Sequence, residues 1–124
     1  MPSRAMEEFA EILVRQVRDA AVRNCDALLQ PNAASRAAKR WRQSTVKSES
    51  LRTIIPDVVD EVVFSLLQAI DQGSLRMKFV SGGAEVDLTA EGLGELAGWY
   101  MGHGGWRAMF SRERFEDDFT DLAK

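Results

Sequence analysis

The segment that most constrains the fold runs from Pro56 to Gln72, where apolar side chains recur at the 3.6-residue period of an α-helix. Pro56 suits the first turn of a helix, where its missing amide hydrogen is not needed. Gly73 suits the left-handed residue that follows a helix. The segment therefore predicts a central core helix, whose inner half is formed by Val59, Val62, Val63, Leu66, Leu67 and Ile70.

Two further helices are expected before this one. The first begins after Ser3, whose hydroxyl can cap the free amides, and ends before Pro31. On a 100° wheel its apolar stripe has Asn24 in the middle, as a buried amide, and consists of Met6, Phe9, Leu13, Val17, Ala20, Ala21 and Leu28. A shorter helix follows at about 33–43. Residues 44–53 show no period and predict a loop.

After Gly73 the apolar period changes from 3.6 to 2, which predicts a β-hairpin with its turn at residues 81–83. Pairing Lys78 with Glu85 and Arg76 with Asp87 gives the hairpin one charged face and one apolar face. Because two strands alone are barely stable, we expect this hairpin to pack on the central helix.

Two helices complete the expected fold. Thr89 can cap a helix over about 90–101, and Ser111 can cap a last one, whose stripe is formed by Phe115, Phe119 and Leu122. The prediction is a single globular domain, residues 1–124. Its class is α+β and mainly helical, in the order α-α-α-β-β-α-α, with one antiparallel hairpin.

Composition limits the class of protein. Apolar residues make up 45% of the chain, and no apolar run approaches the roughly 18 residues that cross a bilayer. A single cysteine, Cys25, cannot form an internal disulfide, which favours a reducing compartment. We therefore expect a cytoplasmic protein with no membrane association. One histidine and one cysteine do not make a zinc site, and no metal or cofactor is expected.

The segment 98–107 is the most unusual, because it holds the only histidine and two of the three tryptophans among four glycines. Gly94, Gly98 and Gly102 at i, i+4 and i+8 predict a ridge without side chains along one helix, against which another element packs. The alternative is a small-ligand-binding protein or enzyme, in which a ligand or anion is held by Trp99, His103, Trp106 and Arg107. No catalytic residue is predicted, and the non-enzymatic interpretation is favoured.

Residues 31–56 carry a net charge of +5 on an otherwise acidic chain. This stretch gives a second alternative, nucleic-acid binding through Arg36, Lys39, Arg40, Trp41 and Arg42. A pI near 5.2 and the absence of a nucleic-acid motif argue against it. We favour a solvated or partner-docking face.

Phe64 carries the leading hypothesis. On the wheel it stands opposite the apolar half of the central helix, surrounded by Asp57, Asp60, Gln68 and Asp71, while Ile12 is similarly isolated on the first helix. Either the last helix covers Phe64 or another chain does. We interpret these residues as an interface, and the protein as a non-enzymatic cytosolic interaction module of the inhibitor, immunity-type or regulatory kind. It would bind a protein partner, with self-association as a homodimer.

Overall fold

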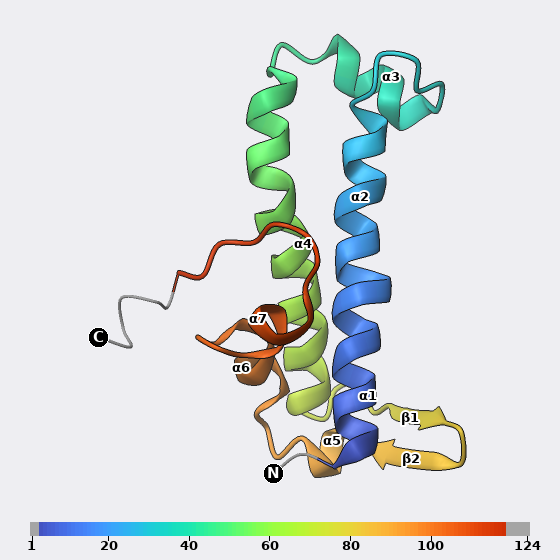
Figure 1. Ribbon diagram of the computed structural model, residues 1–124, viewed down its shortest axis with the longest axis vertical. Helices are drawn as coiled ribbons and strands as arrows, with labels where there is room; N and C mark the ends of the chain where they lie inside the picture. Colours follow the sequence, from blue (N-terminus) through green and yellow to red (C-terminus); the bar gives the residue numbers. More distant parts are fainter. Residues whose placement is uncertain (1–2, 119–124) are drawn as a thin grey trace.

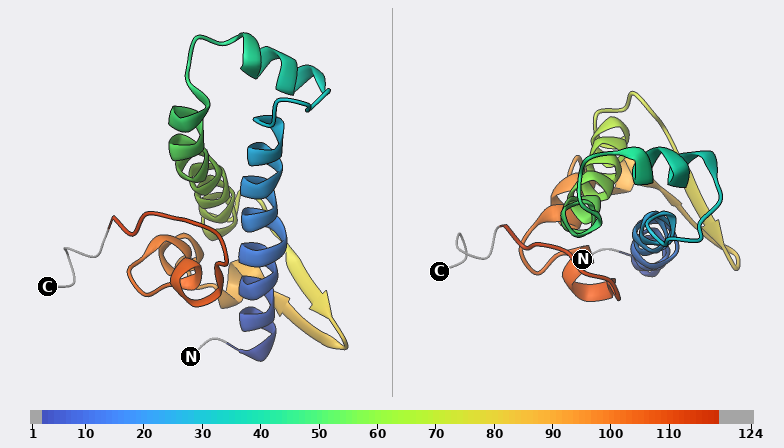
Figure 2. Two further views of the ribbon diagram at one scale, coloured as in Figure 1. Left: turned by 45° about the horizontal axis from the view of Figure 1, so that its top comes forward. Right: turned by 90° about the horizontal axis from the view of Figure 1, so that it is seen from above.

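The computed structural model describes residues 3–118, and it confirms a mainly helical α+β fold with one antiparallel hairpin (Figure 1). Two long helical rods stand side by side, α3 joins them at one end, and the shorter elements gather around the other end (Figure 2). No helix in this range is both long and apolar enough to cross a membrane. The elements are α1 (Arg4–Ile12), η1 (Leu13–Arg18), α2 (Asp19–Leu28), α3 (Arg36–Gln43), α4 (Ser48–Asp71), β1 (Lys78–Ser81), β2 (Ala84–Asp87), α5 (Leu88–Glu91), α6 (Leu96–Met101) and α7 (Trp106–Phe110).

The first rod is one continuous helix whose middle, η1, is wound as a π-helix. Ser3 caps it as predicted, since its hydroxyl accepts a hydrogen bond from the Met6 amide at 3.1 Å. A π turn takes one extra residue, so every later side chain is displaced around the helix axis. The predicted stripe is therefore wrong beyond Val14: Val17 is 49% exposed and Asn24 is exposed, while Arg18 and Asp19 are buried.

The second rod, α4, begins eight residues earlier than predicted, so Pro56 lies inside it and most of the expected loop is helical. Proline has no amide hydrogen, which leaves the Arg52 carbonyl without its donor four residues on. The Arg114 guanidinium replaces that donor, with Nη2 at 2.7 Å from the carbonyl. Arg114 also binds both oxygens of Asp26, at 2.8 and 2.9 Å, and so ties α2 to α4.

The inner face of α4 is turned relative to the prediction. Val63, Leu67 and Ile70 are buried as expected, but Val62 and Leu66 are exposed. Asp60 is buried, and Phe64 packs against the core. The expectation that Phe64 points away from the core is therefore wrong. The helical-wheel prediction placed only apolar side chains of α4 inside, whereas the folded chain also buries the Asp60 carboxylate.

The hairpin pairs Lys78 with Asp87 and Phe79 with Val86, two residues away from the predicted register. Gly82 and Gly83, at φ of 53° and 85°, form a two-residue turn that the prediction had taken as three residues. A shift of two keeps each side chain on its predicted face. The apolar face packs on α1 rather than on the central helix, with the rings of Phe9 and Phe79 edge to face at 5.7 Å.

The predicted helix 90–101 is broken in two. Leu93 and Gly94 adopt positive φ of 54° and 73°, and α6 then starts anew at Leu96. The ridge of three glycines does not form, because Gly94 lies outside α6. Asp87 caps α5 in place of Thr89, accepting a hydrogen bond from the Ala90 amide at 3.2 Å.

The predicted last helix is wrong over residues 111–118, which are not helical. Ser111 ends α7 instead of starting a helix. The chain then lies along the first rod, where Glu113 approaches Arg23 and Arg114 binds Asp26. Phe119 and Leu122 lie outside the described residues.

The Asp26–Arg114 pair predicts acid sensitivity. The Arg114 hydrogen bond holds the pKa of Asp26 below its usual value. The pair therefore stabilises the fold above the unfolded-state pKa of about 3.9, and this contribution is lost as pH falls through the lower folded-state pKa. Asp26→Asn removes the titrating group at almost constant size. In urea unfolding, the difference in stability between wild type and variant should be constant above about pH 5 and shrink as pH is lowered further. A difference that does not change with pH would contradict this role.

Candidate functional site

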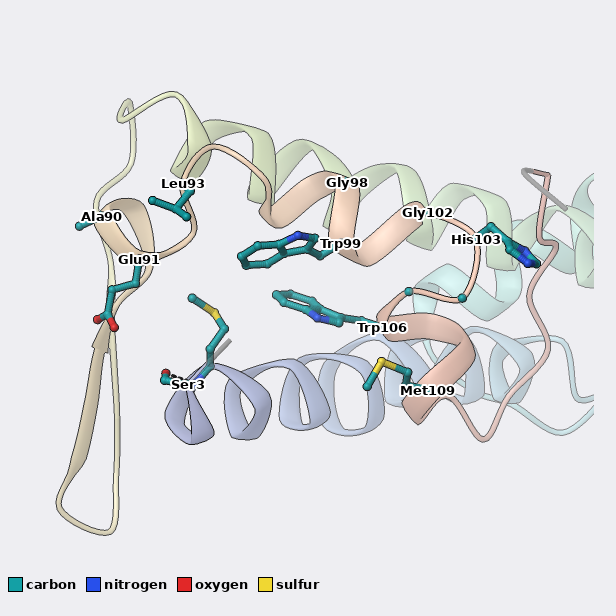
Figure 3. A pocket seen from close by; sticks show the side chains of 13 residues that line it. Ser3, Ala90, Glu91, Leu93, Gly98, Trp99, Gly102, His103, Trp106 and Met109 are labelled. Carbon is teal, nitrogen blue, oxygen red and sulfur yellow. Dashed lines mark hydrogen bonds between the residues drawn. The ribbon is translucent and has the colours of Figure 1, made fainter. Parts of the chain in front are cut away.

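A cavity of about 880 Å³ opens between α6, α7, the residues after β2 and the start of α1 (Figure 3). It contains three of the four residues that the sequence suggested for a ligand: Trp99, His103 and Trp106. Its other walls are formed by Ser3, Met6, Ala90, Glu91, Leu93, Gly98, Gly102, Gly104, Gly105 and Met109.

The two tryptophans form the aromatic wall. Trp106 is almost fully buried between Phe9 and Trp99, with both ring centroids 6.0 Å away. Trp99 is half-buried. The glycine-rich turn between α6 and α7 sets this arrangement, because a Cβ on Gly105 would lie 2.2 Å from the Trp99 carbonyl oxygen.

Arg107, the fourth suggested ligand residue, does not line the cavity. Its side chain is buried, with Nη1 donating to Asp60 Oδ2 at 2.9 Å and Nη2 donating to the Met101 carbonyl at 3.1 Å. The ring of Phe115 covers the guanidinium at 4.9 Å. An anion held jointly by His103 and Arg107 is therefore incompatible with the structure.

Asp60 is the centre of a buried ionic cluster that joins the two rods to α6 and α7. Its Oδ1 accepts hydrogen bonds from Arg18 Nε at 2.9 Å and the Tyr100 hydroxyl at 2.5 Å. Its Oδ2 accepts one from Arg107. Arg18 also donates to Asp19 at 3.0 Å, and Asp19 accepts from the Arg112 amide at 2.7 Å. Two arginines and two aspartates thus balance in charge.

Two members of the cluster, Arg18 and Tyr100, have raised pKa values. Burial alone would lower the pKa of Arg18, but its hydrogen bonds and the charge of Asp60 outweigh burial and raise that pKa. Burial, together with the hydrogen bond to Asp60, raises the pKa of Tyr100 far above its usual value, so the phenol remains a donor. These groups hold the elements together rather than exchange protons. The only sequence signal for the cluster was the Arg18–Asp19 pair within the first helix.

Of the residues suggested as an interface, only Phe64, Gln68 and Asp71 come together, at a small hollow between α4 and α6. Asp71 caps α6, accepting from the Leu96 and Ala97 amides at 2.9 and 3.0 Å. Asp57 and Gln68 are exposed, Asp60 belongs to the cluster, and Ile12 is half-buried. They do not surround an exposed ring.

Another apolar surface takes its place, on the side of the two rods away from residues 111–114. Residues two positions apart on a helix point about 200° away from each other. Asp19 and Asp26 face the C-terminal segment and Asp60 faces α6 and α7. The residues two positions before and after these aspartates therefore lie on the opposite side of the two rods. We call this surface the α2–α4 face; it contains Val17, Ala21, Asn24, Leu28, Val58, Val62 and Leu66.

The basic stretch lies on α3 and its flanks, at the end of the molecule opposite the hairpin (Figure 1). Arg36, Lys39 and Arg40 are exposed there and Trp41 is half-buried. Arg42 instead donates to the Ala33 carbonyl at 2.6 Å, which fastens the loop before α3. Nucleic-acid binding by this stretch stays an untested alternative.

His103 lines the cavity, whereas Cys25, the only cysteine, does not. Burial and the charge of Asp26 raise the pKa of Cys25. His103 Nδ1 lies 2.9 Å from Asp117 Oδ2, at the end of the cavity opposite Ser3 (Figure 3). Across residues 3–118, no three His, Cys, Asp or Glu side chains gather closely enough to hold a metal ion.

No protein-family model matches the chain, and no similar curated protein or solved structure was found.

Replacing Asp60 tests the cluster. In Asp60→Ala two buried guanidiniums lose their shared carboxylate, and breaking a buried ion pair on one side costs about 3–5 kcal/mol. Asp57→Ala, one turn earlier on the exposed side of α4, should change stability by about 0.5 kcal/mol or less. Urea unfolding of both variants measures the difference. Equal losses would show that the cluster does not hold the fold together.

Proposed function

We propose that this chain is a non-enzymatic protein-interaction module that acts as a homodimer, assembled through the α2–α4 face. The observation that carries the proposal is the apolar stripe left uncovered on α4, where Val58 and Val62 are 57% and 66% exposed. Val17 of η1 is exposed on the same side. Contiguous exposed apolar surface of this kind is typical of protein interfaces.

A second copy of the chain is the occupant that fits this face. Helices are about 10 Å wide and rise about 1.5 Å per residue, so two adjacent rods offer a surface about 20 Å wide and about 27 Å long over residues 51–69. That is about 540 Å². The residues at the rim add to this area, and a standard interface buries roughly 800 Å² per partner. Two such pairs of antiparallel helices placed face to face form a four-helix bundle.

The charges along the edges favour one arrangement of the two copies. The edge of the face on α4 carries Asp57 and Glu61, whereas the edge on the first rod carries the uncharged Gln16 and Ala27. Placing α4 of one copy against the first rod of the other keeps the acidic edges apart. Pairing α4 with α4 in antiparallel fashion would bring four carboxylates together, which is unfavourable.

The cavity gives no support to an enzymatic alternative. Its serine, Ser3, accepts the Met6 amide as a helix cap and lies far from His103 (Figure 3). A catalytic nucleophile needs a base within hydrogen-bond reach. The described lining offers no such pair.

Val62→Asp tests the homodimer, and Val80→Asp is its matched control. The two valines are equally exposed, at 66% and 65%, but Val80 lies on the hairpin outside the α2–α4 face. Sedimentation equilibrium should give a dimer for wild type and for Val80→Asp. In a Val62→Asp dimer each copy would bury an unpaired carboxylate. The dissociation constant of the dimer should therefore rise at least about tenfold.

Two results would contradict the homodimer. One is a wild-type mass of a single chain at every concentration measured. The other is an equal dissociation constant for Val62→Asp and wild type. Circular dichroism of both variants shows whether each substitution leaves the monomer folded.

A further inference from the structure

We propose that the cavity beside Trp99 binds an apolar organic cation, such as a quaternary ammonium compound. This inference goes beyond the homodimer and is independent of it, because it concerns a different surface. It depends on the side chains of the cavity wall, on the charges around it and on a glycine in that wall.

The wall presents the groups that attract such a cation. Indole rings carry negative charge on their faces, and they bind ammonium groups best among the aromatic side chains. The rings of Trp99 and Trp106 lie side by side along the cavity, tilted by 51° (Figure 3). Met6 and Met109 add polarizable thioethers, which adapt to apolar ligands of varied shape.

The charges around the cavity exclude an anion and favour a cation. None of the described residues lining it is a lysine or an arginine. Glu91 lies at its rim, where one carboxylate oxygen accepts a hydrogen bond from the Asp87 amide at 2.9 Å. The carboxylate of Glu95 is also close, with one oxygen 4.0 Å from where a Cβ on Gly98 would lie. Two arginines follow lining residues in the sequence. Arg107 is turned into the core, where it binds Asp60, and Arg4 pairs with Glu8 at 3.8 Å.

Gly98 lines the cavity, and it also lines the smaller hollow beside Phe64. An interior glycine weakens a helix by about 1 kcal/mol relative to alanine, so its presence in α6 needs a reason. Gly104 has a positive φ, and Gly105 lies too close to a carbonyl oxygen for any side chain. Gly98 has neither restriction, and a Cβ there would meet no atom closer than 4.0 Å. A side chain at this position would therefore enter open space at the wall of the cavity.

Three probes of similar size but different charge test the proposal by isothermal titration calorimetry. They are benzyltrimethylammonium, uncharged benzyl alcohol and the anion phenylacetate. The cation should bind at least about tenfold more tightly than the other two, because only the cation gains from the half-buried indole ring of Trp99 and from the acidic residues near the cavity. Equal affinities, or binding of none of the three, would overturn the proposal.

Three variants locate the binding site on the same protein. Gly98→Leu should abolish binding of the cation while the melting temperature stays unchanged or rises. Trp99→Ala should weaken binding about tenfold. Glu91→Gln should weaken binding of the cation but not of benzyl alcohol, and Glu85→Gln on the hairpin is its control. Unchanged affinity in Gly98→Leu and Trp99→Ala would place binding elsewhere and refute the inference.

A peptide that carries trimethyllysine presents the same quaternary ammonium group on a protein side chain, and its affinity is compared with that of the free cation. If the peptide binds more tightly than the free cation, the natural source is a modified protein side chain. If the free cation binds more tightly, the source is a small molecule. Val62→Asp alters the α2–α4 face alone. If the variant binds the cation as wild type does, the cavity is a binding site whether or not the homodimer forms. If neither protein binds the cation, only the cavity proposal fails.

Discussion

The Asp60 carboxylate is the group on which the arrangement of this protein depends. It receives hydrogen bonds from Arg18 on the first rod, Tyr100 on α6 and Arg107 on α7, so one side chain connects four elements. A buried carboxylate is stable only when its charge and both oxygens are satisfied. The rotation of the two rods about their own axes is therefore set by where these four side chains meet.

That rotation determines what each side of the molecule presents. Turning Arg18 and Asp60 inward turns Val17 and Val62 outward, which creates the α2–α4 face. Turning Arg107 inward removes the only strong positive charge from the glycine-rich segment and leaves the cavity to tryptophan and methionine. The two proposed binding surfaces are thus consequences of one buried cluster, although they lie in different parts of the molecule and are tested separately.

Local sequence signals predicted local structure well. The Ser3 cap, the left-handed Gly73 and the separation of charged and apolar side chains on the hairpin are all confirmed, because each depends on neighbouring residues. The rotation of the rods was missed, because a wheel with a fixed period cannot represent a π turn, and because Asp60 is buried by partners up to 47 residues away. The aromatic part of the cavity was predicted, but the burial of Arg107 was not.

The central claim is that the buried cluster turns Val62 outward and that a second copy then covers it. The most direct measurement is the rate of thiol modification at Val62→Cys, in a Cys25→Ser background, over a series of protein concentrations. Arg36→Cys on α3 is the exposed reference. The account predicts that Val62→Cys reacts readily in dilute solution and becomes protected as concentration rises, while Arg36→Cys reacts equally throughout. A Val62→Cys thiol that is protected even in dilute solution, or that reacts at the same rate at every concentration, would contradict it.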